Sequence, residues 1–225
     1  MRDYYKQVFD VKKQENMRNF FLDMAKGGKR KAFNKGEEVK VGTDKPYIAI
    51  VTKGRVKQSV FGKNGREKIL YILQPGEIFG EFAYLGGGKD LIVGQAMEPC
   101  EISVFFKDDL DRVLASNPEA YKYIAHSMCR KFRIVLMQMS DLIFKNSLGR
   151  LCDILLRLYC QQGKPTENGF LIDLPLTHEN IANLIGCDRV TVTRGLNRLK
   201  KEGIIHIEGK KIVIKELEKL EKYGE

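Results

Sequence analysis

The chain has 225 residues, of which 43% are hydrophobic and 30% are charged, and its formal net charge is +10. This length allows one large domain or two small ones, each with a core of its own. No apolar run is long enough to span a bilayer and the N-terminus has no signal-peptide core, so we expect a cytoplasmic protein without membrane contact. The positive charge indicates an anionic partner.

The cysteines indicate neither a disulfide framework nor a metal site. They are five in number, scattered, and form no C-x-x-C pair, whereas frameworks and zinc sites need paired spacings. We expect most of them to be small buried side chains, with a redox-sensing thiol as the alternative. No metal and no cofactor are expected.

The first half of the chain predicts a leading helix followed by many short strands. The helix is expected over 16–26, and the basic run at 26–35 is interpreted as a solvated surface. Residues 27–108 hold more than half of the 21 glycines. Asn-Gly in "KNGR" at 63–66 is typical of a tight hairpin turn, because both residues tolerate positive φ. Short strands at regular spacing predict an antiparallel barrel or jelly roll.

A single long helix is predicted over 118–145. Pro118 suits its first turn, and apolar residues then recur at alternating spacings of four and three, which is the heptad pattern of a coiled coil. We expect this apolar seam to pair two copies of the chain, while packing within one domain is the alternative. The seam consists of Tyr121, Ala125, Met128, Phe132, Val135, Met139 and Leu142.

A break after the long helix starts a second region. Asn146 or Ser147 is expected to cap the next helix, which carries "LGRLCDILLRLYCQQ". The glycines and the proline within 161–170 predict a loop after that helix. The remainder, 170–225, reads as strand, helix, turn, helix and hairpin.

The stretch "LTHENIANLIGCDRVTVTRGLNRLKKEGIIHIEGKKIVI" predicts a winged helix-turn-helix. Thr177 is expected to cap a short helix, and Gly186 permits the tight turn that follows it. Asp188 is expected to cap a second helix over 189–202. A hairpin with its turn at 208–210 then forms the wing.

The second of these helices has residue types that are suited to reading DNA. An α-helix fits the major groove, and its first turns reach the base edges. Arginine holds guanine with two hydrogen bonds, valine and threonine methyls contact the thymine methyl, and flanking cations neutralise phosphates. A buried helical pair with a solvated charged surface is the alternative. The outer face is expected to show Arg189, Val190, Thr193, Arg194 and Asn197.

Over almost its whole length the chain resembles the CRP/FNR family, the cyclic-AMP receptor protein and its relatives. The resemblance is carried by "LQPGEIFGE", "LGRLCDILLRL" and "IANLIGCDRVTVTRGLNRLKKEGII". It implies an α+β fold in three parts: a double-stranded β-helix (jelly-roll) sensor domain over 1–116, a dimerisation helix and hinge over 117–146, and a winged helix-turn-helix domain over 147–225.

The resemblance further implies a bacterial transcriptional regulator that binds a near-palindromic site on double-stranded DNA as a homodimer. Some relatives touch RNA polymerase at the position of 161–170, so activation is favoured over repression. Arg189 and Arg194 match family arginines that read bases. Val190 replaces a frequent glutamate, which favours an A·T-rich half-site. The other expected DNA contacts are Thr177, Thr191, Thr193, Arg198 and Gly209.

The sensor domain departs from the cyclic-nucleotide pattern. In family members that bind these nucleotides a glutamate, here Glu81, holds the ribose, and an Arg-Ser pair holds the phosphate. Asp90 and Leu91 stand at the Arg-Ser positions, and a carboxylate repels a phosphate. Lys89 compensates weakly, since it lacks the bidentate geometry of arginine. We therefore expect the glycines at 86–88 to form a loop and the effector to be something other than a cyclic nucleotide.

The expected effector pocket is apolar on its helix side, which suits a small organic acid or an aromatic ligand. Seam packing without any ligand is the alternative. The pocket is expected to involve Gly80, Glu81, Lys89, Met128, Phe132, Val135 and Leu136. The missing arginine, together with "VTV" in the recognition helix, also resembles the halo-aromatic-sensing members of the family.

Other functions stay open as alternatives. A cAMP-dependent regulator and a constitutive DNA binder with a purely structural roll would both fit the fold. A metal-dependent jelly-roll enzyme would need clustered histidines, and no histidine precedes His126, so we expect no enzymatic activity. The same argument disfavours a haem sensor, and an iron–sulfur sensor would need cysteines before Cys100.

Overall fold

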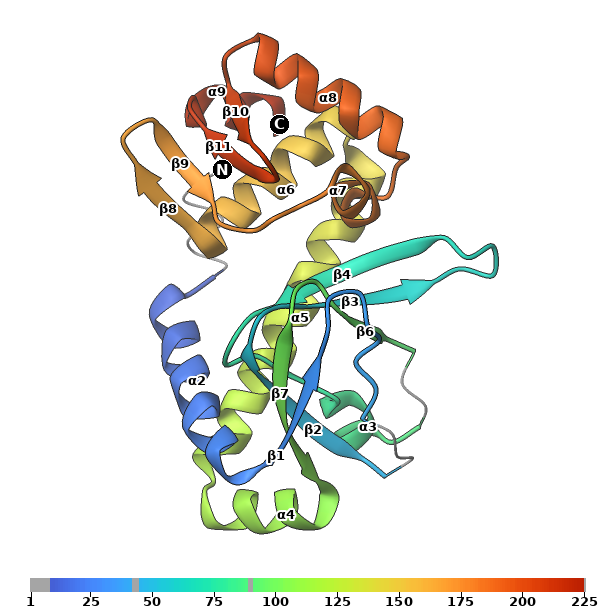
Figure 1. Ribbon diagram of the computed structural model, residues 1–225, viewed down its shortest axis with the longest axis vertical. Coiled ribbons are helices and arrows are strands. Elements are labelled where there is room, and N and C mark those ends of the chain that lie inside the picture. Colours follow the sequence, from blue (N-terminus) through green and yellow to red (C-terminus); the bar gives the residue numbers. More distant parts are fainter. Residues whose placement is uncertain (1–8, 42–44, 89–90, 225) are drawn as a thin grey trace. The chain divides into compact units, whose positions relative to one another are not determined.

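The computed structural model describes residues 9–41, 45–88 and 91–224, which are drawn in colour in Figure 1. They divide into an N-terminal unit, residues 12–134, and a C-terminal unit that contains residues 135–224 together with 9–11. One long helix crosses this division. The predicted three-part division, with boundaries after 116 and after 146, therefore stays a prediction.

Two antiparallel sheets build the N-terminal unit, and they confirm the predicted jelly roll. One sheet has the strand order β1-β7-β2-β5, and the other has the order β4-β3-β6. Apolar residues on β2 and β7, among them Ile50 and Ile102, are fully buried and form the core. The strands are β1 (Lys29–Phe33), β2 (Tyr47–Lys53), β3 (Val56–Phe61), β4 (Glu67–Leu73), β5 (Ile78–Phe79), β6 (Val93–Ala96) and β7 (Cys100–Phe106).

The leading helix begins earlier than predicted and closes one end of this core. It is α2 (Val11–Met24), followed by the 3₁₀ turn η1 (Ala25–Gly27), and its buried Met17 and Phe21 join the core of the strands. Part of the basic run after it forms β1, an edge strand with mostly exposed positions. Charged side chains on an edge strand hinder pairing with a further strand, so this run has a structural role as well as a solvated surface.

The hairpin predicted from "KNGR" is present, but its turn is of another kind. β3 and β4 pair antiparallel across it. Gly65 has φ +76°, whereas no non-glycine residue in the described part of the chain has positive φ. The backbone N–H of Gly62 donates to Arg66 O at 2.9 Å, so the loop is longer than a two-residue turn. Asn64 supports it through its side chain, which accepts from the N–H of Arg66.

Within the described residues, α3 (Glu81–Gly86) lies between β5 and β6, and α4 (Lys107–Ser116) and the long α5 (Glu119–Phe144) follow the last strand. Only α5 was predicted, and Figure 1 shows it as one continuous helix. The glycine run ends α3, and Gly87 and Gly88 continue with φ of +67° and +80°. The start of α5 packs on the core of the N-terminal unit through Ala120 and Ile124.

Within the described residues, the C-terminal unit contains the end of α5, four complete helices and a four-stranded sheet with the strand order β10-β11-β9-β8. Its buried centre is α6, whose Leu151 and Leu155 are at most 1% exposed. Of the two candidate caps, Asn146 caps this helix by accepting from the N–H of Gly149. The elements are α6 (Ser147–Gln162), β8 (Gly163–Thr166), β9 (Gly169–Ile172), α7 (His178–Ile185), α8 (Arg189–Lys201), β10 (Ile205–Glu208), β11 (Lys211–Ile214) and α9 (Leu217–Gly224).

The loop predicted at 161–170 is wrong. This stretch contains β8 and the start of β9, which pair as a hairpin, and β9 extends the wing sheet by pairing with β11. Glycine and proline end the helix here as expected, but the same residues are compatible with a short edge strand. The predicted wing hairpin is confirmed, with Gly209 at φ +62° in its turn.

A cluster of three buried charges and the half-buried Lys145 lies where α5 meets α6. Asp141 pairs with Arg157 at 3.3 Å, and Lys145 pairs with Asp153. Burial raises the pKa of Asp141 to about 6, the neighbouring Asp153 carboxylate acts in the same direction, and Arg157 opposes both. Asp141 therefore keeps its proton to a higher pH in the folded chain than in the unfolded one.

We expect the contribution of Asp141 to the free energy of unfolding to be larger at pH 4 than at pH 6. Because its folded pKa lies above the ordinary value of 3.8, the folded state binds more protons between these limits, so stability falls as pH rises, by about 1.4 kcal/mol per pH unit for one group. Urea unfolding of Asp141→Asn at several pH values should show this slope reduced. Asp173→Asn is the control, because the pKa of Asp173 is about 2. An identical slope in wild type and Asp141→Asn would contradict the assignment.

Candidate nucleic-acid interface and sensor site

The predicted cap and turn of the helix-turn-helix are confirmed. The hydroxyl of Thr177 accepts from the N–H of Asn180 at 3.0 Å, and the Asn180 side chain accepts from the N–H of Thr177 at 3.1 Å. This reciprocal capping box starts α7. Gly186 ends α7 with φ +68°, a conformation that favours glycine.

Asp188 caps α8 as predicted. Its carboxylate accepts from both the N–H and the hydroxyl of Thr191, each at 2.8 Å. These bonds lower the pKa of Asp188, so a negative charge sits at the helix start, where the helix dipole favours it. The hydroxyl proton of Thr191 is thereby already bonded. α8 ends at Lys201, one residue before the predicted end.

The two faces of α8 separate as predicted. Val192, Leu196 and Leu199 are at most 1% exposed, whereas Val190 is 57% exposed. Gly195 lies against α6, where an added Cβ would meet Leu151 at 2.7 Å, so a larger residue would push α8 outward. On the outer face Arg189, Arg194 and Asn197 are exposed and Thr193 is half-buried.

A groove of about 460 Å³ lies between the starts of α7 and α8 and the turn of the wing. It brings together three of the predicted DNA contacts, Thr177, Arg189 and Gly209. His178 and Lys210 line it too and were missed by the sequence analysis, although both stand directly beside predicted contacts. The remaining charged residue in its lining is Glu179, so two cations face one carboxylate.

In the N-terminal unit, the carboxylate of Glu81 pairs with a lysine from α5. The side chains of Glu81 and Lys131 are 0% and 2% exposed and form an ion pair at 2.5 Å. Lys131 also donates to Ile78 O at 2.7 Å and lies 5.3 Å from the centre of the Tyr71 ring. Sequence reasoning missed Lys131, because a lysine on a helix usually lies at the surface.

A second buried pair reinforces this junction. Arg130, the residue before Lys131, pairs with Glu77 at 2.9 Å. Glu77 also accepts from the side chain of Gln14 at 2.9 Å and from the N–H of Gln74 at 3.0 Å. Both glutamates of "GEIFGE" are thus tied to α5 by adjacent cations, so β5 and α3 are fixed to this helix.

The other residues of the expected effector pocket lie in different surroundings. Gly80 precedes Glu81 with φ +92°, and a Cβ there would lie 2.6 Å from Tyr47 O. Met128 packs on the core of the N-terminal unit, and Phe132 is 64% exposed. Val135 and Leu136 lie on the part of α5 that belongs to the C-terminal unit. Lys89 lies outside the described residues.

Comparison with known proteins decides the family. Residues 30–117 match the cyclic nucleotide-binding domain family, and residues 149–223 match the Crp-like helix-turn-helix domain family. The CRP-like cAMP-activated global transcriptional regulator of Mycobacterium tuberculosis is 30% identical over 79% of this chain and 78% of its own length. The chain belongs to the CRP/FNR family of transcriptional regulators.

One further relative and two solved structures are also similar to this chain. The global nitrogen regulator of Nostoc is 29% identical over 91% of this chain and 94% of its own. A CooA variant from Carboxydothermus hydrogenoformans has a TM-score of 0.78 at 23% identity, covering 90% of both chains. CprK in complex with OCPA has a TM-score of 0.69 at 25% identity, covering 91% and 93%. The suggested nearness to the halo-aromatic-sensing members is therefore not favoured over other members.

Membership in the CRP/FNR family makes this chain a DNA-binding transcription factor with an effector-binding domain, and not an enzyme. Among the described residues, no helix is long and apolar enough to cross a membrane.

Arg198 differs from the other predicted DNA contacts of this CRP/FNR protein. Its guanidinium donates to Glu202 at 3.0 Å and to the Tyr223 hydroxyl at 3.1 Å, and it stacks 5.1 Å from the centre of the Tyr223 ring. It lies in the last turn of α8 and does not line the groove. Its bonds serve the junction of α8 with α9.

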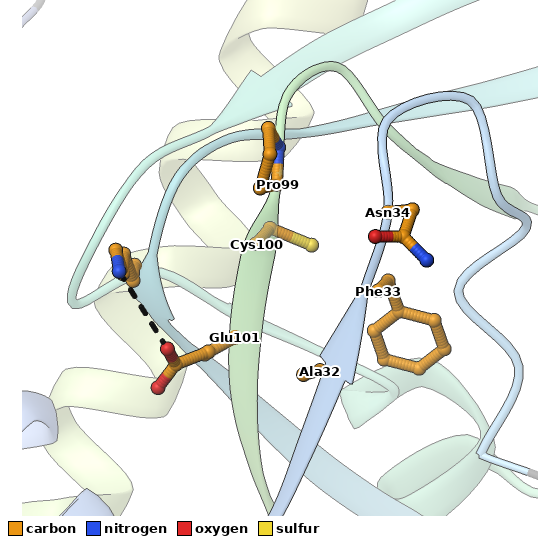
Figure 2. A pocket seen from close by; sticks show the side chains of 7 residues that line it. Ala32, Phe33, Asn34, Pro99, Cys100 and Glu101 are labelled. Atoms are coloured by element: carbon orange, nitrogen blue, oxygen red, sulfur yellow. Dashed lines mark ion pairs between the residues drawn. The ribbon is translucent and has the colours of Figure 1, made fainter.

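A second concave site lies at the edge of the sheet in the N-terminal unit. Figure 2 shows Ala32, Phe33 and Asn34 facing Pro99, Cys100 and Glu101 around it. Its volume is about 180 Å³, and Lys53 on β2 pairs with Glu101 on the neighbouring β7 at 3.8 Å. Burial raises the pKa of the Cys100 thiol, which makes this cysteine a poor nucleophile. No predicted site residue lies here.

Proposed function

We propose that this CRP/FNR protein is a transcriptional activator that binds a near-palindromic, A·T-rich DNA site as a homodimer. The observation that carries the proposal is the outer face of α8, where Arg189, Val190 and Arg194 are exposed while the opposite face is buried. The first turns of such a helix reach base edges in the major groove.

The residues of this surface divide into two roles. Arg189 and Arg194 hold guanines, and Val190 packs on a thymine methyl. Lys210 and the backbone at Gly209 contact phosphates, which position the helix without reading sequence. Thr177, Thr191 and Arg198 are omitted because their donors are bonded inside the domain: Thr177 to Asn180, Thr191 to Asp188, and Arg198 to Glu202 and Tyr223.

The second copy of the chain binds along the seam of α5. Phe132, Met139 and Leu142 are 64%, 54% and 45% exposed, and Ile143 and Phe144 beyond them are exposed by 70% and 79%. Large exposed apolar side chains gathered along one helix of a monomer mark an interface. The heptad spacing of the seam favours an identical helix as its partner.

The effector that gates this regulator is a small molecule other than a cyclic nucleotide. Glu81 is buried and forms an ion pair with Lys131. In addition, no arginine occurs between Arg66 and Arg112 to hold a cyclic phosphate. cAMP is the second candidate, since relatives are named as cAMP-activated. Calorimetric titration of the full-length protein with cAMP separates the two, and we expect no binding heat. A constitutive DNA binder would show the same operator affinity with and without metabolite extract.

RNA polymerase is the expected protein partner in the cytoplasm. The position at which some family members touch the polymerase corresponds here to the β8–β9 hairpin. The exposed Lys164 and Thr166 of β8 offer polar contacts. Transcription of a template carrying the selected DNA site should rise when the protein is added, and a fall would identify a repressor.

The test of the DNA-binding surface is Arg189→Ala. We expect this variant to lose discrimination at one base pair of each half-site, by about 1–3 kcal/mol, because a bidentate contact to guanine disappears. Selection of bound duplexes from a random pool, with wild type and variant in parallel, measures the effect.

The control is Lys210→Ala, which removes a phosphate contact. It should weaken binding to all sequences alike and reduce the slope of log K against log salt by about one. Unchanged sequence preference in Arg189→Ala would refute the assigned role of Arg189.

A further inference from the structure

His178 and Thr193 join the two helices of the helix-turn-helix through one hydrogen bond. His178 is the first residue of α7, and its Nδ1 lies 2.8 Å from the hydroxyl oxygen of Thr193 on α8. The same hydroxyl donates to Arg189 O, one turn earlier in α8, at 3.0 Å. Thr193 is half-buried and lies on the outer side of α8, three residues after the exposed Val190.

The Thr193 hydroxyl donates its proton to a hydrogen-bond acceptor inside the domain. A threonine hydroxyl has one proton to donate. If the hydroxyl donates this proton to Arg189 O, His178 Nδ1 carries a proton of its own and donates it to the hydroxyl oxygen. If the hydroxyl donates to His178 Nδ1, Arg189 O accepts from the backbone alone. In either arrangement the hydroxyl cannot donate to a DNA base without breaking an internal bond.

The bond to Arg189 O also fixes the side-chain rotamer of Thr193. A threonine in a helix has few allowed χ1 values, and a back-bond to the carbonyl four residues earlier selects one of them. With the hydroxyl held by Arg189 and His178, the methyl group is the part of Thr193 that is left without a polar partner. This is the group that would contact an apolar feature of DNA.

We propose that His178 is a positioning residue, which holds the Thr193 hydroxyl inward so that Thr193 reads the 5-methyl group of a thymine. This inference rests on the proposed function and deepens it. Val190 and Thr193 are three positions apart and therefore adjacent on the surface of the helix. They form an apolar pair between the flanking arginines, and the half-site accordingly contains a thymine opposite each of them.

Replacing single thymines by deoxyuridine in the selected duplex tests this inference, because the change removes only the 5-methyl group. At fixed salt and pH 8, we expect wild type to lose about fourfold in affinity at the thymine opposite Thr193, the value of one methyl group. Thr193→Val keeps this loss, because it keeps a methyl group at that place. Thr193→Ser has no methyl group and shows no loss.

The decisive variants concern His178. In His178→Ala only the back-bond to Arg189 O still holds the Thr193 hydroxyl, so the side chain is less restrained and the thymine-to-uracil ratio should fall. The double variant His178→Ala/Thr193→Val should recover the ratio, because valine has one strongly preferred χ1 rotamer in a helix and carries methyl groups at two of the three positions on Cβ. A role of His178 in folding alone would not produce this rescue, and melting temperatures of all variants record any loss of folding.

Three outcomes would overturn the proposal. The first is an unchanged ratio in His178→Ala. The second is a uniform loss of affinity in that variant with a shallower salt slope, which would make His178 a phosphate contact. The third is an unchanged ¹⁵N chemical shift of His178 Nδ1 on Thr193→Val in the DNA-free protein, because the hydrogen bond would then be absent. If the wild-type protein selects no DNA sequence, the proposed function is refuted instead. The ¹⁵N chemical shift then still shows whether His178 and Thr193 are hydrogen-bonded.

Discussion

Replacing Met139 by glutamate is expected to convert the protein to a monomer and to weaken binding to its DNA site by about 10²–10⁴-fold, the gain that two linked half-sites give over one. Met139 lies in the exposed apolar row of α5 and is itself 54% exposed. In a parallel pair of helices the two glutamates would face each other and would be removed from water. Two like charges in that position oppose association.

The measurements are the mass in solution, by sedimentation equilibrium, and the affinity for the selected duplex. Ser140→Glu is the matched control, because Ser140 is the next residue of the same helix, is exposed, and lies outside the seam. It should stay dimeric with affinity within about twofold of wild type, in line with the small effects of most surface substitutions. A dimeric Met139→Glu variant with full affinity, or a monomeric wild type, would refute the role assigned to the seam.

The DNA-binding surface could be predicted because its determinants are local. Thr177 and Asp188 each bond to a backbone N–H three residues away, so the cap and its helix are visible in one short stretch of sequence. Gly186 marks the turn by the conformation that it alone accepts easily. The contact between His178 and Thr193 spans only fifteen residues, but no rule of spacing predicts a bond between side chains on two different helices.

The sensor site could not be predicted in the same way. Lys131 and Glu81 are fifty residues apart, and neither pattern nor propensity indicates that a lysine of a long helix is buried against a glutamate. The expectation that Glu81 is available to a ligand followed from the resemblance alone. The β8–β9 hairpin and α4 were missed for a related reason, since short elements have weak periodicity and their pairing depends on the tertiary fold.

Replacing Lys131 by methionine is expected to destabilise the protein by about 3–5 kcal/mol, because the substitution leaves the carboxylate of Glu81 buried without a partner. Methionine keeps the length and the apolar stem of the lysine, so the loss reports on the charge rather than on a cavity. Urea unfolding measures it. The exposed pair of Lys26 and Asp23, whose side chains are 77% and 78% exposed, gives the control: Lys26→Met should cost less than about 1 kcal/mol.

The double variant Glu81→Gln/Lys131→Met tests whether the cost comes from the unpaired charge. Since it removes both charges together, it should regain most of the stability that Lys131→Met loses. The same pair bears on the effector, because a ligand that binds Glu81 has to displace Lys131 or share the one carboxylate oxygen, Oε2, that has no hydrogen-bond partner. A Lys131→Met variant as stable as wild type would show that Glu81 does not depend on this lysine, and the main structural argument against a cyclic nucleotide would be lost.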